Sequence, residues 1–314
     1  MKTVEELNAR FGAPARIVFR PGFAGYPNVV LANRYGTAEI ALLGANVLSY
    51  RPTGHGPVLF RPARRDADYN RGDKFHGGVP VCWPQFGNRF SKDLPQHGFA
   101  SKMVFDVRGT EYSEDVTEVT LGLRDDLVTR QLWPHAFDLT VKVSVSMKLN
   151  LALTTTNTGS EPLAFSCGFH PYLAVRDRDG VTVRGLDGCA YTDGTTAEMK
   201  RGVWAGDLKV DFAPDHIFEM KPAPRHAYAV LDPGLKRAIA VASSGNDRAV
   251  VWNPGAETRL ADLAADDWMR FVCVEPVSDW PGGRTLAPGA NHVLYAAIQA
   301  HLETADGMND GRMA

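Results

Sequence analysis

The sequence is poor in cysteine, has no excess of charge of either sign and contains no long apolar run. Its four cysteines show no CxxC spacing, and most of them lie in apolar segments, where a free thiol behaves as a small hydrophobic side chain. Because disulfides are rare in the reducing cytosol, such cysteines favour a cytoplasmic protein. They are Cys82, Cys167, Cys189 and Cys273.

The 34 basic and 36 acidic side chains almost cancel. Nucleic-acid surfaces and polybasic membrane patches need a basic excess, so we expect neither partner and favour a small neutral or modestly charged ligand. No apolar stretch approaches the roughly 18 residues of a spanning helix. The N-terminus is charged where a signal peptide would be apolar, so we expect a soluble protein that is not exported.

The first residues carry the pattern of one short helix. Thr3 and Glu6 have the spacing of a capping box, and apolar residues recur at helical intervals as far as Phe11. Gly12 is then expected to end the helix in a left-handed conformation.

The rest of the chain consists of short β-branched and aromatic runs separated by Gly, Pro and Asn. Between Leu139 and Leu153 apolar and polar residues alternate, which places the apolar set on one face of a sheet. Because strands rarely exceed about 10 residues, we expect a tight turn at 148–150. A helical turn or two is expected at 258–267. Many strands without alternating long helices predict an all-β fold, a large antiparallel β-sandwich.

No internal repeat and no Pro/Ser-rich linker divides the chain. We therefore expect a single domain at 15–303, with the helix of residues 1–14 packed on it and a disordered tail at 304–314. The long connection 61–89 carries Trp, Tyr and His, which is typical of a binding loop on a rigid scaffold. Its arginines are interrupted by aspartates, which predicts a solvated loop of mixed charge. These arginines are Arg61, Arg64, Arg65 and Arg71.

Two histidines and one glutamate lie far apart in the sequence, each in a short apolar segment bounded by Gly or Pro: His97, His170 and Glu275. A carboxylate in a Val/Cys/Phe run is costly to bury without a partner, and burial shifts its pKa towards the range useful for proton transfer. The pattern therefore suggests a general acid/base pair.

Each of these residues also has a plainer interpretation. His97, like His76, lies beside a glycine, where an imidazole can simply satisfy backbone groups of a loop. His170 could be a core histidine, since it precedes a proline in an extended context. Glu275 could be solvated at the end of a strand.

A series of short motifs adds a family resemblance to this pattern. They are Gly44–Ser49, His76–Gly87, Pro95–Ala100, Phe169–Tyr172, Pro214–Phe218, Val250–Pro254, Val272–Glu275 and Leu286–Gly289. In this order they resemble the glucose-6-phosphate 1-epimerases, also called hexose-6-phosphate mutarotases, and the resemblance extends from about residue 19 to residue 294. It implies the galactose-mutarotase-like β-sandwich and an isomerase that acts at the anomeric carbon of a sugar.

The resemblance also implies roles for single residues. His170 would protonate the ring oxygen as general acid, and Glu275 would take the proton of the C1 hydroxyl as general base. Gln96, His97 and Asp215 would hydrogen-bond sugar hydroxyls. Trp252 would line the pocket. Without the resemblance, Asp215 would equally be a turn residue and Trp252 a core residue. No cofactor, metal or covalent intermediate is implied, and we expect a monomer.

The chain departs from the resemblance at two positions that bear on the substrate. Phosphate-specific members have arginines that grip the 6-phosphate where this chain has His76 and Ser101. A histidine and a serine do not replace guanidinium groups, which are always charged and bind phosphate with two hydrogen bonds. Lys74, Arg89 and Lys102 could supply substitute charge. A mutarotase for a non-phosphorylated or sulfonated aldose is therefore an alternative.

Two other classes of function stay open at this point. A non-catalytic carbohydrate-binding protein could use the same sandwich, because a fold does not determine a function. A metal-dependent enzyme could use His97, His170 and Glu275 as ligands, although these residues lack the close spacing of the strong metal motifs.

Overall fold

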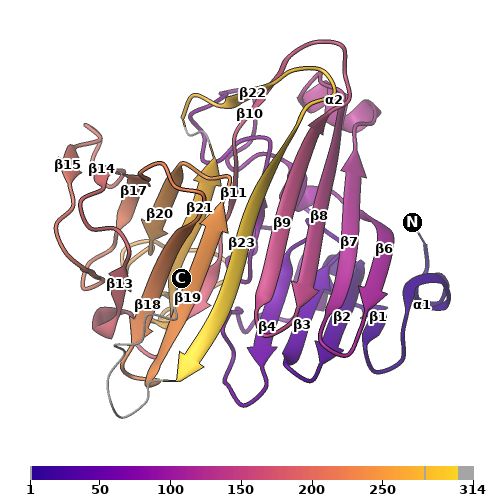
Figure 1. The fold of residues 1–314 in the computed structure, drawn as a ribbon, viewed down its shortest axis with the longest axis horizontal. Helices are drawn as coiled ribbons and strands as arrows, with labels where there is room; N and C mark the ends of the chain where they lie inside the picture. The colour runs from indigo at the N-terminus through magenta and orange to yellow at the C-terminus, as the bar shows by residue number, and fades with distance from the viewer. Residues whose placement is uncertain (1, 279–280, 303–314) are drawn as a thin grey trace.

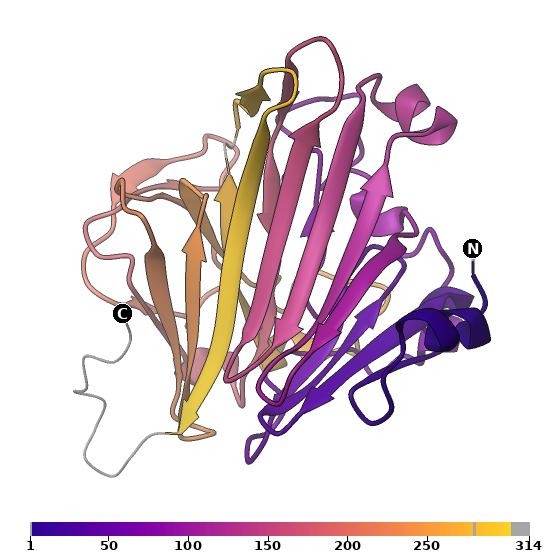
Figure 2. The ribbon, with the colours of Figure 1, turned by 45° about the vertical axis from the view of Figure 1, so that its right-hand side comes forward.

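The computed structural model describes residues 2–278 and 281–302, and it places their strands in two layers (Figures 1 and 2). The predicted disordered tail at 304–314 lies outside the described residues. Within the described residues no helix is both long and apolar enough to cross a bilayer.

One layer is a long antiparallel sheet, here called the large sheet, which has nine strands among the described residues. Strand β23 runs down its middle and is the longest (Figure 1). In spatial order the strands are β16 (Leu208–Lys209), β13 (Thr182–Arg184), β18 (His226–Asp232), β19 (Arg237–Ser244), β23 (Asn291–Leu302), β9 (Leu149–Asn157), β8 (Phe137–Val145), β7 (Thr117–Arg124) and β6 (Asp106–Tyr112).

The second layer contains the sheet that carries the site, here called the pocket sheet. Its strands within the described residues are β15 (Arg201–Val203), β14 (Ala190–Asp193), β17 (Asp215–Glu219), β20 (Arg248–Trp252), β21 (Phe271–Ser278), β11 (Cys167–Phe169) and β5 (Val81–Cys82), with β12 (Tyr172–Ala174) also paired to β21. Contacts of β21 with β19 and β23 place this sheet against the large sheet.

An N-terminal meander lies beside the pocket sheet in the second layer. It consists of β1 (Ile17–Pro21), β2 (Pro27–Asn33), β3 (Gly36–Ala41) and β4 (Val47–Pro52). Its contacts with β7 and β8 place it behind the other half of the large sheet, as Figure 2 shows. A small ribbon pairs β10 (Leu163–Phe165) with β22 (Arg284–Leu286). The predicted all-β sandwich is confirmed.

The predicted hairpin is present as β8 and β9, and the alternation buries one apolar set between the layers. The turn occupies 146–148, two positions earlier than expected, and Leu149 already pairs with Val145. Asn150 belongs to the strand and supports the turn through its side-chain amide, which donates to the carbonyl of Lys148 at 3.3 Å.

The N-terminal helix α1 (Val4–Phe11) is confirmed, and both hydrogen bonds of the capping box between Thr3 and Glu6 are present. Its left-handed ending is wrong, because Gly12 has an extended backbone with φ of −73°. The glycine is needed for space: a Cβ there would lie 2.5 Å from the carbonyl oxygen of Asn8. The side chain of Asn8 in turn bonds the backbone of Phe19 and so fixes the helix on β1.

One further α-helix, α2 (Leu127–Leu132), is not among the predictions. It begins at Asp126, whose carboxylate accepts from the backbone N–H of Thr129. Single 3₁₀ turns occur at Phe23–Gly25, Asp66–Asp68, Ala100–Lys102, Arg178–Gly180 and Asp267–Arg270. The last of them begins at the final residue of the segment 258–267, in which a helical turn was predicted.

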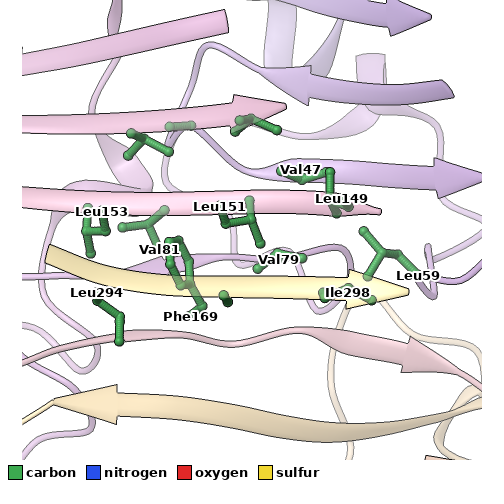
Figure 3. Packing of buried hydrophobic residues seen from close by; sticks show 14 of the residues in the cluster. Val47, Leu59, Val79, Val81, Leu149, Leu151, Leu153, Phe169, Leu294 and Ile298 are labelled. Atoms are coloured by element: carbon green, nitrogen blue, oxygen red, sulfur yellow. The ribbon is translucent and has the colours of Figure 1, made fainter. Parts of the chain in front are cut away.

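The buried side chains between the layers explain why polar groups gather on the other face of the pocket sheet. Figure 3 shows Val81 and Phe169 among leucines of β9 and β23. Because side chains alternate along a strand, the residues next to these two point away from the core. On β21 the same alternation puts Val274 in the core and Glu275 on the opposite face.

Candidate active site

A pocket of about 540 Å³ opens on the outer face of the pocket sheet. This volume lies in the range typical of small-molecule sites. The structure brings all of the predicted site residues to its walls: His76, Gln96, His97, Ser101, His170, Asp215, Trp252 and Glu275.

Neighbouring strands position the residues at the floor of the pocket. Glu275 lies within β21, a strand that is buried along its whole length. His170 directly follows β11, which pairs with β21. On the other side, Trp252 of β20 is directly opposite Asp215 of β17. Pairing in the sheet therefore determines how these side chains are spaced.

His170 and Glu275 form a close buried pair. The Nε2 atom of His170 lies 3.4 Å from Oε2 of Glu275, and the side chain of Glu275 is only 1% exposed. Burial, aided by the nearby His97 and His76, lowers the pKa of His170 well below its usual range. Burial, aided by the charge of Asp215, raises the pKa of Glu275 well above its own. Both shifts favour the neutral side chains, so the proton of the pair resides on Glu275.

The conformation of His97 depends on the loop between β5 and the 3₁₀ turn at Ala100–Lys102. The amide of Gln85 donates to the carbonyl of Pro95 at 2.8 Å, which draws this loop together. His97 and Gly98 both have positive φ, 63° and 72°. A Cβ on Gly98 would lie 2.1 Å from the carbonyl oxygen of Trp83, so only glycine fits there.

His97 is a neutral hydrogen-bond donor towards the pocket. Its Nδ1 accepts from the backbone N–H of Gly87 at 3.2 Å. Burial lowers the pKa of His97 to about 4. In a neutral imidazole one nitrogen accepts and the other donates, so Nε2 carries the proton.

Aromatic rings enclose His170. Tyr172 stacks on it with the ring centroids 4.9 Å apart, and Trp252 meets it edge to face at 5.5 Å. Both rings line the pocket, as does Gln96, whose Oε1 accepts from Lys74 at 3.3 Å. Tyr172 belongs to one of the motifs quoted above, but sequence reasoning assigned it no role.

The pocket also has an unneutralised basic lining. None of its four lysines and arginines makes an ion pair within the described residues. They are Arg71, Lys74, Arg89 and Lys102.

The predicted mixing of charges in this loop is confirmed, but not every arginine is solvated, because Arg61 is partly buried and also pairs with the buried Glu39. Arg61, Arg64 and Arg65 all pair with aspartates of the same loop. Arg71 instead donates to the backbone carbonyl of Lys102 at 2.9 Å and lines the pocket.

His76 is anchored by a residue that sequence reasoning missed. The buried Asp262 accepts from the backbone N–H of His76 at 2.8 Å and lies 2.6 Å from its Nδ1. The two residues are 186 positions apart, and Asp262 falls in the segment for which a helical turn was expected. No spacing in the sequence signals this contact.

One group of side chains has the chemistry of a metal site. The ligating atoms of His170, Cys273 and Glu275 lie within 4.8 Å of one another. Cys273 and Glu275 share a strand face, two positions apart. This group differs from the sequence hypothesis, which contained His97 in place of the cysteine.

Comparisons with known proteins agree on one family. A sequence profile described as Aldose 1-epimerase matches residues 27–299. A Salmonella typhimurium protein named "Putative glucose-6-phosphate 1-epimerase" is 30% identical over 242 residues, which cover 76% of this chain and 79% of that protein. An Escherichia coli protein of the same name is also 30% identical, covering 76% of this chain and 78% of that protein.

Solved structures show the same fold. A "putative mutarotase" from Salmonella typhimurium superimposes with a TM-score of 0.82 at 26% identity, over 92% of this chain and 94% of that one. A galactose 1-epimerase from Lactobacillus acidophilus superimposes with a TM-score of 0.70 at 13% identity, over 88% and 95% of the two chains. At that identity the similarity establishes the galactose-mutarotase-like fold alone.

Proposed function

We propose, since the chain belongs to the aldose 1-epimerase family, that it interconverts the α and β anomers of a hexose 6-phosphate, with His170 and Glu275 as its acid/base pair. Membership of this family makes the chain an isomerase that acts on carbohydrates, so a non-catalytic binding protein is not favoured. The observation that carries the proposal is the 3.4 Å separation of His170 Nε2 and Glu275 Oε2 on the pocket wall.

The proposed reaction needs only the movement of protons. His170 donates a proton to the ring oxygen while Glu275 accepts the proton of the C1 hydroxyl, and the bond from C1 to the ring oxygen breaks. The open aldehyde rotates about its C1–C2 bond. Closure on the other face of the carbonyl returns both protons, with the two side chains exchanging roles. Positioned acid/base groups contribute about 10²–10⁴-fold to such a rate.

The pKa directions suit this exchange of roles. Burial favours the neutral forms, in which the one proton of the pair resides on Glu275. The form that starts ring opening has the same number of protons, with the proton on His170 instead. Only a transfer between the two side chains separates these forms, so the enzyme needs no proton from solvent in each cycle.

The sugar itself would be held by neutral donors and by a ring face. We assign hydroxyl recognition to Gln96, His97 and Asp215, and packing against the sugar ring to Trp252. The Nε2–H of His97 can donate to a hydroxyl. Burial raises the pKa of Asp215, and the carboxyl oxygens can accept from a hydroxyl.

The charge of the pocket favours a phosphorylated sugar over a neutral one. Ser101 and His76 replace the expected arginines, yet Arg71, Lys74, Arg89 and Lys102 line the pocket without carboxylate partners among the described residues. Cations without partners in a concave site concentrate anionic ligands. The substitute charge thus comes from neighbouring positions.

Anomer exchange measured by NMR tests the substrate. We expect kcat/KM for glucose 6-phosphate to exceed that for glucose by at least tenfold. Lys102→Gln should raise the KM for the phosphate ester severalfold and leave glucose unaffected. Lys92→Gln is the matched control, because Lys92 is exposed and does not line the pocket. Equal rates on the two sugars, or faster turnover of a sulfonated aldose, would overturn the phosphate assignment.

The setting of the enzyme is also part of the proposal. We place it in the cytoplasm as a monomer that needs no cofactor. All four cysteines are free and buried, which suits a reducing compartment. Size-exclusion chromatography with light scattering measures the oligomeric state.

A further inference from the structure

The contact between Asp262 and His76 joins two loops across the pocket. Asp262 lies between β20 and β21, whereas His76 lies in the long loop before β5. The carboxylate side chain is 3% exposed and the imidazole 15%. Besides its two hydrogen bonds with His76, Asp262 is approached by the hydroxyl of Tyr69 at 3.5 Å.

The charge of Asp262 is maintained by His76. Burial opposes ionisation of this carboxyl, but the hydrogen bonds from His76 outweigh burial and lower the pKa of Asp262. An ionised carboxylate can only accept hydrogen bonds, so the nitrogen 2.6 Å away must donate. Nδ1 of His76 is therefore protonated.

The opposite nitrogen of the ring is consequently free for a ligand. Nε2 of His76 makes no hydrogen bond to any residue in the described part of the chain, and the side chain lines the pocket. Asp262 bonds both the backbone N–H of His76 and Nδ1 of its imidazole ring. The ring therefore cannot rotate to bring Nε2 to another partner. The orientation of Nε2 is thus settled before a sugar binds.

We infer that Asp262 is a positioning residue, which holds His76 so that its Nε2 binds an oxygen of the sugar substrate. The inference rests on the proposed function, because it takes the ligand to be a sugar phosphate. Asp262 acts only through His76 and touches no reacting atom. It sets substrate affinity, whereas His170 and Glu275 set the chemical rate.

A purely structural role for Asp262 would have different consequences. Loss of a loop anchor would loosen the loop between β20 and β21 whether or not His76 is present. A positioning role instead disappears once His76 is gone. The two are separated by a double-mutant cycle of Asp262→Asn and His76→Gln.

Asp267→Asn supplies a matched control in the same loop. Its carboxylate accepts from the backbone N–H of Ala264 at 2.8 Å, and it has no contact with His76. It therefore reports the effect of weakening the loop alone.

The experiment measures the Kd of glucose 6-phosphate by titration calorimetry, together with KM and kcat from anomer exchange. We expect Asp262→Asn and His76→Gln each to raise Kd and KM about tenfold, which is the equivalent of about 1.4 kcal/mol, with kcat within twofold of the unmodified protein. The double variant should resemble His76→Gln alone. Asp267→Asn should bind normally.

A ¹⁵N spectrum of the histidine rings provides a readout that does not depend on activity. It should show Nδ1 of His76 protonated in the unmodified protein and this preference lost in Asp262→Asn. A double variant that binds more weakly than His76→Gln, a control that matches Asp262→Asn, or a proton on Nε2 alone would overturn the inference.

The outcomes also separate this inference from the proposed function. Binding of glucose 6-phosphate without anomer exchange would overturn only the proposed function, since the cycle in Kd still tests Asp262. If the unmodified protein binds no glucose 6-phosphate, both are overturned.

Discussion

Replacing Glu275 with glutamine should change activity and stability in opposite directions. The amide cannot accept the proton of the C1 hydroxyl, so we expect turnover to fall by about 10²–10⁴-fold. The fold should be kept, because the two side chains have the same shape. The amide can also donate to the neutral His170, whose Nε2 lies 3.4 Å from the present Oε2.

The sign of the stability change follows from the raised pKa of Glu275. Since burial raises this pKa above the usual 4.5, the folded protein holds the proton more tightly than the unfolded chain. Above pH 4.5 the unfolded chain loses its proton first, so the stability of the unmodified protein falls as pH rises through this window. The glutamine variant avoids this loss and should be the more stable protein at neutral pH.

The size of this stability change is limited by the difference in bound protons between the folded protein and the unfolded chain. One whole proton corresponds to at most about 1.4 kcal/mol for each unit of pH, which is about 2 °C in Tm for a protein of this size. Below pH 4.5, calorimetric scans should therefore give the same Tm for Glu275→Gln and for the unmodified protein. Above pH 4.5, the Tm of Glu275→Gln should exceed that of the unmodified protein by a margin that grows with pH.

The control for this prediction is Glu257→Gln. Glu257 is exposed and does not line the pocket, so neither activity nor Tm should change. A Tm difference for Glu275→Gln that is constant with pH would refute the reasoning about burial, and undiminished turnover would refute the assignment of Glu275 as base.

Three further predictions concern the same site. Because the pKa of His170 is lowered and that of Glu275 raised, the profile of kcat/KM should be flat across neutral pH; a step at the ordinary histidine value of 6.5 would contradict the one-proton pair. Added Zn²⁺ should inhibit by binding to His170, Cys273 and Glu275, and Cys273→Ala should weaken this inhibition. A chelator should not slow the untreated enzyme. A loss of rate on adding the chelator would point to metal catalysis. Gly98→Ala should lower stability by more than about 1 kcal/mol, because the methyl group would meet the carbonyl of Trp83. It should also reduce sugar affinity, since relief of that clash shifts the loop that carries His97. An unchanged Tm would show that the loop adapts.

Local patterns in the sequence were reliable where neighbouring residues decide the structure. The capping box of Thr3 and Glu6 begins the first helix as predicted, and alternation between Leu139 and Leu153 produces the expected hairpin. The position of its turn was missed because Asn150, a residue typical of turns, acts from the adjacent strand. The first helix ends at Gly12 as predicted, but the left-handed conformation is wrong, because glycine is needed there to avoid a clash and not for a positive φ.

Contacts between distant segments could not be predicted from such patterns. Strand β5 is only two residues long and exists through its pairing with β11. The hydrogen bonds between Asp262 and His76 likewise have no signal in the neighbouring sequence. His170 and Glu275 were suggested by their apolar surroundings, but their roles came from family resemblance, and their spacing depends on the pairing of β11 with β21.

The rigid location of Glu275 has a consequence for how such an enzyme can change. Its strand is buried from end to end, whereas His76, Gln96 and Ser101 belong to connecting segments. Mutations in those segments can therefore alter which sugar is accepted without moving the groups that relay protons. Libraries confined to the loops would explore new specificities, while variation in β21 would mainly yield inactive proteins.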